Sequence, residues 1–255
     1  MKKLFLIAAL ALVTLTVSAQ QRLYLSTYKG TDVTKFDGKT CNVTVSRMMF
    51  KGWNTLSLPF AMSEQELNQV FGNDCRLERL VGVEETAGNI QLDFQDCKAD
   101  GLQANTPYII YFTGENSNVN IAKSALIGNA VSSLTFRTQG NEEVTMCGAS
   151  KQTEGEGLYG VMAKDNADAK FVAVGSDTQG FYATRCYIKL ASGTAKQLTT
   201  HHLAASETMG ITAVATENED VDVYNLNGVK VASKIQTATL KPGVYVVKGQ
   251  KVLVK

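Results

Sequence analysis

The fold of this 255-residue chain is restricted most by its many short hydrophobic runs, in which apolar and polar residues alternate. Glycine, asparagine or aspartate separates these runs at close intervals. Successive side chains of a β-strand point to opposite faces, so an alternating run buries one face. Many short runs with turn residues between them are typical of a β-sandwich or barrel. The sequence therefore predicts an all-β fold, a β-sandwich of jelly-roll or immunoglobulin-like type. The expected strands are residues 22–28, 40–50, 55–59, 77–84, 89–94, 107–113, 134–138, 143–147, 158–163, 170–175 and 180–190.

One short helix is expected beside the sheets. Ser63 and Glu66 have the spacing of a capping box, in which each side chain accepts a hydrogen bond from the other residue's backbone N–H. Leu67 and Phe71 then lie on one helical face, and Gly72 is suited to end the helix. Because capping accounts for the acids of this segment, we do not interpret them as catalytic.

The chain divides into four segments by composition. Residues 1–19 form the predicted signal peptide and residues 20–204 the β-sandwich domain. Residues 205–220 are weakly patterned and end in an acidic run, so we interpret them as a linker. Residues 221–255 form a small C-terminal β domain of two hairpins, the first turning at Asn227-Gly228, a sequence that favours a type I′ turn.

The first 19 residues indicate export. Lys2 and Lys3 precede an apolar stretch at 4–13, and small residues lead to a cleavage site between Ala19 and Gln20. A membrane-spanning helix needs about 20 apolar residues, so the stretch is short for a span; a retained N-terminal anchor is the alternative. No later apolar run has spanning length. We expect a cell-surface or extracellular protein, with the periplasm as the alternative.

The charge balance argues against nucleic-acid binding. Residues 1–19 hold two of the 25 basic residues and none of the 24 acidic ones, so the remainder is nearly neutral. A surface that follows phosphates needs clustered lysine and arginine.

The cysteines leave their pairing open. All five lie far apart, without a C-x-x-C pair or a partnered histidine, so zinc spacing is absent. An exported chain can form disulfides, yet an odd number leaves at least one thiol unpaired or paired between chains. Free cysteines that pack as small apolar residues are the equal alternative. The five are Cys41, Cys75, Cys97, Cys147 and Cys186.

The motifs that resemble catalytic or cofactor sites fail a physical test. Gly155, Gly157 and Gly160 have dinucleotide-loop spacing, but a strand is expected to follow them where that loop needs a helix. His201 and His202 are the only histidines, and neighbours on a strand face opposite ways, so they would not bind one metal. We interpret them as a surface or linker pair. No nucleophile motif accompanies them, so we assign no catalytic, cofactor-binding or metal-binding residue.

Two further possibilities concern carbohydrates. A glycosidase needs two carboxylates near each other in space, and five acids offer candidates that we interpret instead as solvated positions. Trp53, the only tryptophan, lies in a segment typical of a core strand, so it is not expected to form a sugar-stacking platform. The five acids are Glu84, Glu85, Asp93, Asp96 and Asp100.

Several segments together resemble a β-rich module of secreted Bacteroidetes proteins. The resemblance spans about residues 22–195. Such modules occur in surface proteins and adhesin-like arrays and have no established chemistry, so the resemblance implies no catalytic residues. The segments that carry it are 52–60, 63–72, 102–110, 157–160 and 183–190.

The C-terminal segment is similar to the sorting domain of type IX (Por) secretion cargo. The resemblance implies transport across the outer membrane by the secretion machinery and release or attachment at the surface. It covers only about the last 35–45 residues, so a domain that folds without acting as a signal stays an alternative. The matching segments are 223–231 and 240–247, and the key residues are Tyr224, Gly228, Gly243, Tyr245 and Lys255.

These observations favour an exported, non-enzymatic binding or adhesion module whose ligand is an outer-membrane or surface glycan or protein. A secreted glycan-directed hydrolase with a carboxylate pair is one alternative. A structural subunit of a surface assembly, which would present an exposed sheet edge, is another.

Overall fold

The computed structural model describes residues 21–128, 133–162, 169–176, 180–204, 222–225, 230–233, 243–247 and 250–254. The predicted signal peptide with its Ala19–Gln20 junction, the predicted linker, Gly228 and Lys255 lie outside these residues. The described part confirms an all-β, sandwich-like fold with one α-helix and a small C-terminal β-sheet.

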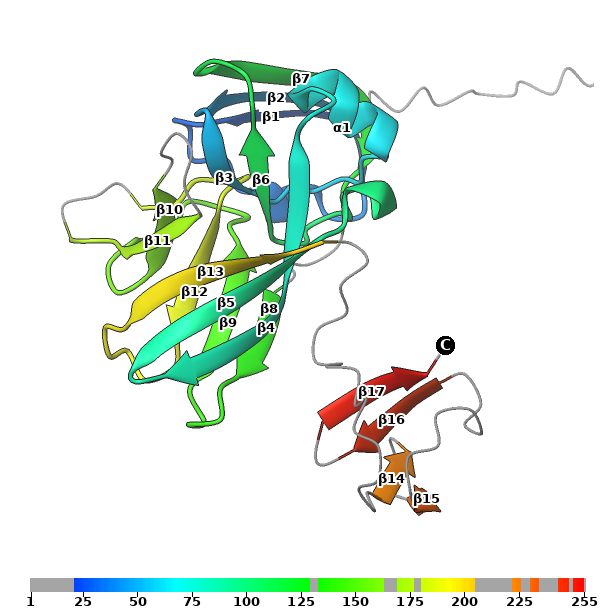
Figure 1. Cartoon of the computed structure of the whole chain (residues 1–255). Helices are drawn as coiled ribbons and strands as arrows, with labels where there is room; N and C mark the ends of the chain where they lie inside the picture. The colour runs from blue at the N-terminus through cyan, green and yellow to red at the C-terminus, as the bar shows by residue number, and fades with distance from the viewer. Residues whose placement is uncertain are drawn as a thin grey trace, which may run out of the picture.

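Three sheets make up the body between residues 21 and 204, which we call the three-sheet body (Figure 1). The first sheet contains β1 (Gln21–Ser26), β2 (Thr40–Met49) and β7 (Ser117–Leu126). The central sheet has the order β13 (Gln197–Leu203), β5 (Asn89–Asp96), β4 (Arg76–Thr86), β6 (Tyr108–Phe112) and β3 (Gly52–Leu56). The third sheet has the order β11 (Lys170–Ala173), β10 (Tyr159–Met162), β12 (Cys186–Leu190), β9 (Glu143–Gly148) and β8 (Ser133–Arg137).

Most neighbouring strands are antiparallel, but β1 pairs with β2, and β13 with β5, in parallel. Two short 3₁₀ helices, η1 (Val33–Phe36) and η2 (Lys98–Asp100), lie in connections. The sequence Gly155-x-Gly157-x-x-Gly160 runs into strand β10, as predicted, and not into a helix.

The central sheet is buried on both faces at its strand β6. Ile110 belongs to the core formed with the first sheet and α1, and Ile109 to the core formed with the third sheet. Figure 1 shows the first sheet and α1 at one end of the body and β9 and β12 alongside β4, β5 and β13. Since neighbouring residues of a strand face opposite ways, the apolar run of β6 supplies both cores at once.

The helix α1 (Glu64–Phe71) forms as predicted. The Ser63 backbone N–H donates to Glu66 Oε2 at 2.9 Å, and the Glu66 N–H donates to Ser63 Oγ at 3.3 Å. Leu67 and Phe71 are buried, which fixes the helix against the first core. The C-cap Gly72 has a φ of 92°, a left-handed value that favours glycine.

The sequence patterns miss two strands of the body and misplace a third. The strand β7 buries only Val119 and Ile121, and β13 is almost entirely polar, so neither has a strong hydrophobic alternation. Each pairs at the side of its sheet, where the neighbouring strand fixes it. The strand β3 begins at Gly52 and ends at Leu56, earlier than the expected 55–59.

All five cysteines are free thiols, of which Cys41, Cys75 and Cys186 are buried. Burial raises the pKa of Cys97 and of Cys186 to about 12, so both stay protonated at neutral pH. The structure therefore favours cysteines that pack as small apolar side chains.

The C-terminal sheet has the order β15 (Lys230–Ser233), β14 (Asp222–Asn225), β16 (Gly243–Val247) and β17 (Gln250–Val254). Tyr224 on β14 pairs with Val246, and Asn225 pairs with Tyr245 on β16. The predicted sorting-like residues Tyr224, Gly243 and Tyr245 therefore lie on two neighbouring strands.

Candidate functional site

A buried arginine links the three sheets of the body. Arg47 lies on β2 at an inward position among Val43, Val45 and Met49, and only 4% of its surface is exposed. Its Nη1 donates to the backbone oxygen and the Oγ1 of Thr184, and its Nη2 donates to the backbone oxygen of Thr55. Thr55 belongs to β3 of the central sheet, and Thr184 lies two residues before β12 of the third sheet. The side chain of Arg47, on β2 of the first sheet, therefore joins all three sheets.

The backbone is strained at the same point. Thr184 has a φ of 81°, a value that β-branched residues rarely adopt. Its carbonyl oxygen accepts from the Ser57 N–H at 3.0 Å as well as from Arg47. Strained residues persist where surrounding contacts fix them, and they are concentrated at functional sites.

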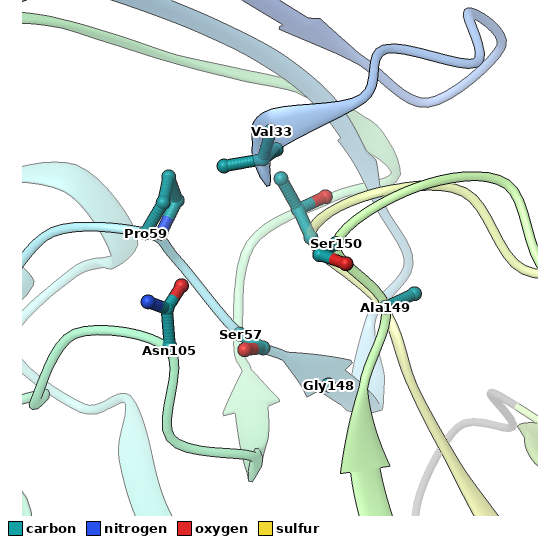
Figure 2. A pocket seen from close by; sticks show the side chains of 8 residues that line it. Val33, Ser57, Pro59, Asn105, Gly148, Ala149 and Ser150 are labelled. Atoms are coloured by element: carbon teal, nitrogen blue, oxygen red, sulfur yellow. The ribbon is translucent and has the colours of Figure 1, made fainter. Parts of the chain in front are cut away.

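On one side of this junction lies a hollow of about 10 Å³, the size of a single water molecule. Figure 2 shows Val33, Pro59, Asn105 and Ser150, from separate segments, around it. Gly148 borders the hollow, and a Cβ there would lie 2.4 Å from Ser57 Oγ. This hollow is too small for an organic ligand.

On the other side lies a larger, partly open cavity of about 220 Å³, which we call the junction pocket. Two arginines and four apolar side chains dominate its wall, at the point where β3 ends the central sheet. Phe50 is 39% exposed and lies at the surface of this wall. The lining residues are Arg47, Met48, Phe50, Trp53, Asn54, Thr55, Val161 and Arg185.

The positive charge of the junction pocket has no acidic partner in the part of the chain that the structure describes. Among the described residues, neither Arg47 nor Arg185 forms an ion pair with a carboxylate. Burial, and then the charge of Arg185, lowers the pKa of Arg47 to about 9, so Arg47 keeps its charge at pH 7. Burial also lowers the pKa of Arg185, and the groups that oppose this effect are the phenols of Tyr28 and Tyr182.

Part of the Arg47 guanidinium has no hydrogen-bond acceptor among the described residues. Its Nε–H is buried and has no hydrogen-bond partner among the described residues. Of the two N–H groups on Nη2, one donates to Thr55. A guanidinium has five N–H donors, so Nε–H and one N–H of Nη2 have no protein acceptor among the described residues.

The neutral polar groups of the junction pocket are already engaged by the protein. The Asn54 side chain donates to the carbonyls of Phe50 and Gly52, at 2.7 and 2.9 Å, and accepts from the Phe50 N–H at 3.1 Å. Thr55 Oγ1 accepts from the Cys186 N–H at 3.0 Å. These groups shape the wall and offer little to a ligand.

Trp53 is a core residue, as predicted. His202 stacks on its ring at 4.5 Å between centroids, and Tyr111 contacts it edge-on at 5.3 Å. The Arg76 guanidinium carbon lies 4.8 Å from the centroid of Trp53. Trp53 is buried, so it supplies apolar wall to the junction pocket and no open stacking face.

The interpretation of the two histidines as a surface or linker pair holds for His201, whose side chain is 53% exposed, and is wrong for His202, whose side chain is only 16% exposed. Both lie on β13, and each contacts a buried carboxylate contributed by another strand. His201 Nδ1 lies 3.0 Å from Asp93 Oδ1, and His202 Nδ1 lies 2.6 Å from Glu78 Oε2. The carboxylates are distant in sequence, so the sequence near the histidines does not indicate them.

The two buried carboxylates do not form a glycosidase pair. Consecutive residues of β13 point to opposite faces of the central sheet, so Asp93 and Glu78, each held by one histidine, also lie on opposite faces. Retaining and inverting glycosidases both need their two carboxylates on either side of one bond. Asp93 is buried, which corrects the expectation that it is solvated.

Two other acids suggested by the sequence have structural partners. Glu85 contacts Lys196 Nζ at 2.6 Å, and Lys196 also lies 3.6 Å from Glu142. The hydrogen bond from Lys196 holds the pKa of Glu85 below its usual range. Asp96 Oδ1 accepts from the Lys98 N–H at 2.9 Å. These contacts fix connections and leave no free acid pair among these residues.

The hydrophobic patterns of the sequence do not identify the arginines of the junction pocket, although one signal is present. Along β2 the alternation Cys41, Val43, Val45 places Arg47 at the next inward position. A charged residue at a core position is unexpected unless it has a role. Arg185 carries no comparable signal, because only the folded chain brings it beside Arg47.

Within the described residues, no group of three histidine, cysteine or acidic side chains is placed to hold a metal ion.

The part of the chain that the structure describes contains no helix of the length and apolarity that crossing a membrane requires.

Comparison of the chain with models of protein families, with curated protein sequences and with solved structures gives no match.

Proposed function

We propose that this protein is an exported, non-enzymatic binding module that acts at or outside the cell surface and holds its ligand in the junction pocket. The observation that carries the proposal is the positive charge of Arg47 and Arg185, which no carboxylate of the described residues balances, beside an apolar wall. A buried charge without a partner costs stability, and a ligand of opposite charge removes that cost.

The pocket is suited to binding and not to acid–base catalysis. Arginine stays protonated near neutral pH and is a poor proton-transfer group. The described residues that line the junction pocket include no histidine, aspartate, glutamate, cysteine or lysine. A ligand held there meets charge and apolar surface but no base or nucleophile of ordinary reactivity.

Export is supported by the basic, apolar and small-residue pattern of residues 1–19. Secretion through the type IX route is supported by the resemblance of residues 221–255 to its sorting domains. The proposal accordingly includes the secretion machinery as a transient partner and the cell surface or the medium as the site of action.

The export part predicts the ends of the native polypeptide. Intact-mass spectrometry of the protein from culture fluid, outer membrane and periplasm should find a chain that begins at Gln20 in the first two fractions. It should end before residue 221 or carry an added anchor there. A periplasmic chain that begins at Gln20 and still ends at Lys255 would contradict the sorting role of the C-terminal sheet.

The binding part predicts ligand-dependent stability that requires Arg185. A thermal-shift screen of neutral sugars, acidic sugars, organic acids and short peptides should find a class that stabilises the wild-type protein and not Arg185→Gln. A ligand at a hundred times its Kd stabilises by about 2.7 kcal/mol, and 1 kcal/mol shifts the Tm by about 2–4 °C at this size. We therefore expect a rise of about 5 °C or more.

Arg137→Gln is the matched control, because Arg137 is exposed on β8 and pairs with Glu143 at 2.7 Å. It should respond to ligands like the wild type. The proposal fails if every stabilising compound acts equally on Arg185→Gln. Mass spectrometry of the ligand after incubation with the protein completes the test. A changed ligand mass would show chemical conversion and would favour the hydrolase alternative.

A further inference from the structure

We infer that the junction pocket binds the carboxylate group of a small organic acid with an apolar body. This inference rests on the proposed function and narrows its ligand to one chemical class. It follows from three properties of the pocket: the sign of its charge, the shape of its free donors, and the nature of the remaining wall.

The charge requires an anion. Arg47 is almost completely buried, Arg185 is partly buried, and among the described residues no carboxylate contacts either of them. The three hydrogen bonds of Arg47 go to two carbonyls and one hydroxyl of the protein, which leave its net charge unbalanced. An anionic ligand supplies the missing charge within a partly enclosed cavity, where electrostatic attraction is stronger than in water.

The donors fit a carboxylate. Arginine presents its N–H groups in a planar fork that matches the two oxygens of a carboxylate. The Nε–H of Arg47 has no protein partner among the described residues, and one N–H of Nη2 is left over. Arg185 lines the same cavity, so a bound carboxylate would meet donors from two directions.

The rest of the wall indicates an apolar body. Met48, Phe50, Trp53 and Val161 provide its apolar surface. A saccharide needs several neutral hydrogen-bond partners, whereas the side chain of Asn54 and the Oγ1 of Thr55 are engaged by the protein. An apolar cavity of about 150 Å³ can hold benzene, so about 220 Å³ has room for a ring of that size with a carboxylate.

Isothermal titration calorimetry with chosen probes tests this inference on protein recovered from cells that express the full-length chain. Phenylacetate should bind, and phenylacetamide, which has the same shape without the charge, should bind at least about tenfold more weakly, since a hydrogen bond between charged groups is worth a factor of ten or more. Glucuronate and sulfate, which lack the apolar body, should also bind at least about tenfold more weakly than phenylacetate. N-acetylphenylalanine distinguishes the carboxylate at the end of a peptide from a free acid: binding tighter than phenylacetate identifies a peptide end, and weaker binding a free acid.

Substitutions at Arg185 separate the contribution of its positive charge from that of its planar guanidinium geometry. Arg185→Gln should weaken phenylacetate binding at least about tenfold. The affinity of Arg185→Lys should lie between those of the wild type and Arg185→Gln, and the affinity of Arg137→Gln should match that of the wild type. Without ligand, Arg185→Gln should have a Tm at or above that of the wild type, because it removes a desolvated charge. A residue with a purely structural role would lower the Tm instead.

The outcomes distinguish this inference from the function on which it rests. If phenylacetamide, glucuronate or sulfate binds as tightly as phenylacetate and depends on Arg185, the carboxylate inference is overturned while the binding function stands. If none of these probes depends on Arg185, the carboxylate inference fails; the proposed function fails as well only if the thermal-shift screen finds no compound whose stabilising effect requires Arg185.

Discussion

Ile110→Ala is expected to lower the free energy of unfolding of the whole three-sheet body by about 2–5 kcal/mol, the usual cost of truncating a buried isoleucine. Ile109→Ala should have a cost in the same range. Both side chains are completely buried, but they point into different cores on opposite faces of β6. Because one strand supports both cores, each variant should destabilise the body as a unit.

Urea unfolding followed by fluorescence and by far-ultraviolet circular dichroism checks this expectation. The single tryptophan, Trp53, lies in the core beside the third sheet and reports on that core, while circular dichroism reports on all the sheets. For Ile110→Ala the two signals should change at the same urea concentration, although Ile110 lies in the other core. Leu126→Ala, a truncation of an exposed residue on β7, is the control and should change little.

Separate transitions for the two signals in Ile110→Ala would contradict the shared central sheet. They would mean that the first sheet and α1 unfold independently of the core around Trp53. The three-sheet body would then be two domains that share a strand without sharing stability.

The hydrophobic pattern of the sequence predicts the strands whose side chains form the cores. It does not predict the strands that are fixed mainly by backbone pairing with a neighbouring strand. The run 107–113 is apolar at every core position, so its strand is evident, although its burial on two faces is not. The strand β13 has the sequence QLTTHHL, and nothing in it indicates a parallel partner. Its place depends on pairing with β5, about a hundred residues earlier in the chain, which local patterns do not encode.

The residues of the candidate site also differ in whether the sequence alone reveals them. Arg47 is visible in the sequence as a charge at an inward position of β2, whereas Arg185 and the strained Thr184 become significant only where three sheets meet. Natural chains depart from local rules most often at functional or strained positions. The junction combines two such departures within one hydrogen-bonded contact: a buried charge without an acidic partner among the described residues, and a left-handed threonine.

The two histidines offer the other large effect, through a comparison of neighbours on one strand. His202→Ala is expected to cost about 1–3 kcal/mol, the range found when a buried hydrogen-bonding group is left without its partner. The side chain of His202 is 16% exposed and that of Glu78 only 2%. Its removal takes away the stacking on Trp53 and leaves the Glu78 carboxylate without its 2.6 Å contact in a site closed to water.

His201→Ala should cost less than about 1 kcal/mol, as for exposed ion pairs. The side chain of His201 is 53% exposed, so water can reach Asp93 once the imidazole is removed. Asp93 Oδ1 also keeps its hydrogen bond from Gln91 at 2.8 Å. The two variants thus remove the same chemical group from adjacent positions that differ in burial and in the contacts of the imidazole.

Urea unfolding gives both free energies, and the emission of Trp53 in the folded state gives an independent local signal. His202→Ala should change that emission because it removes the stacked ring, and His201→Ala should leave it unchanged because His201 faces the other side of the sheet. Equal costs for the two variants would contradict the arrangement. The stacked histidine would then contribute no more than a surface pair, and the Trp53 wall of the junction pocket would lack the support that the structure assigns to it.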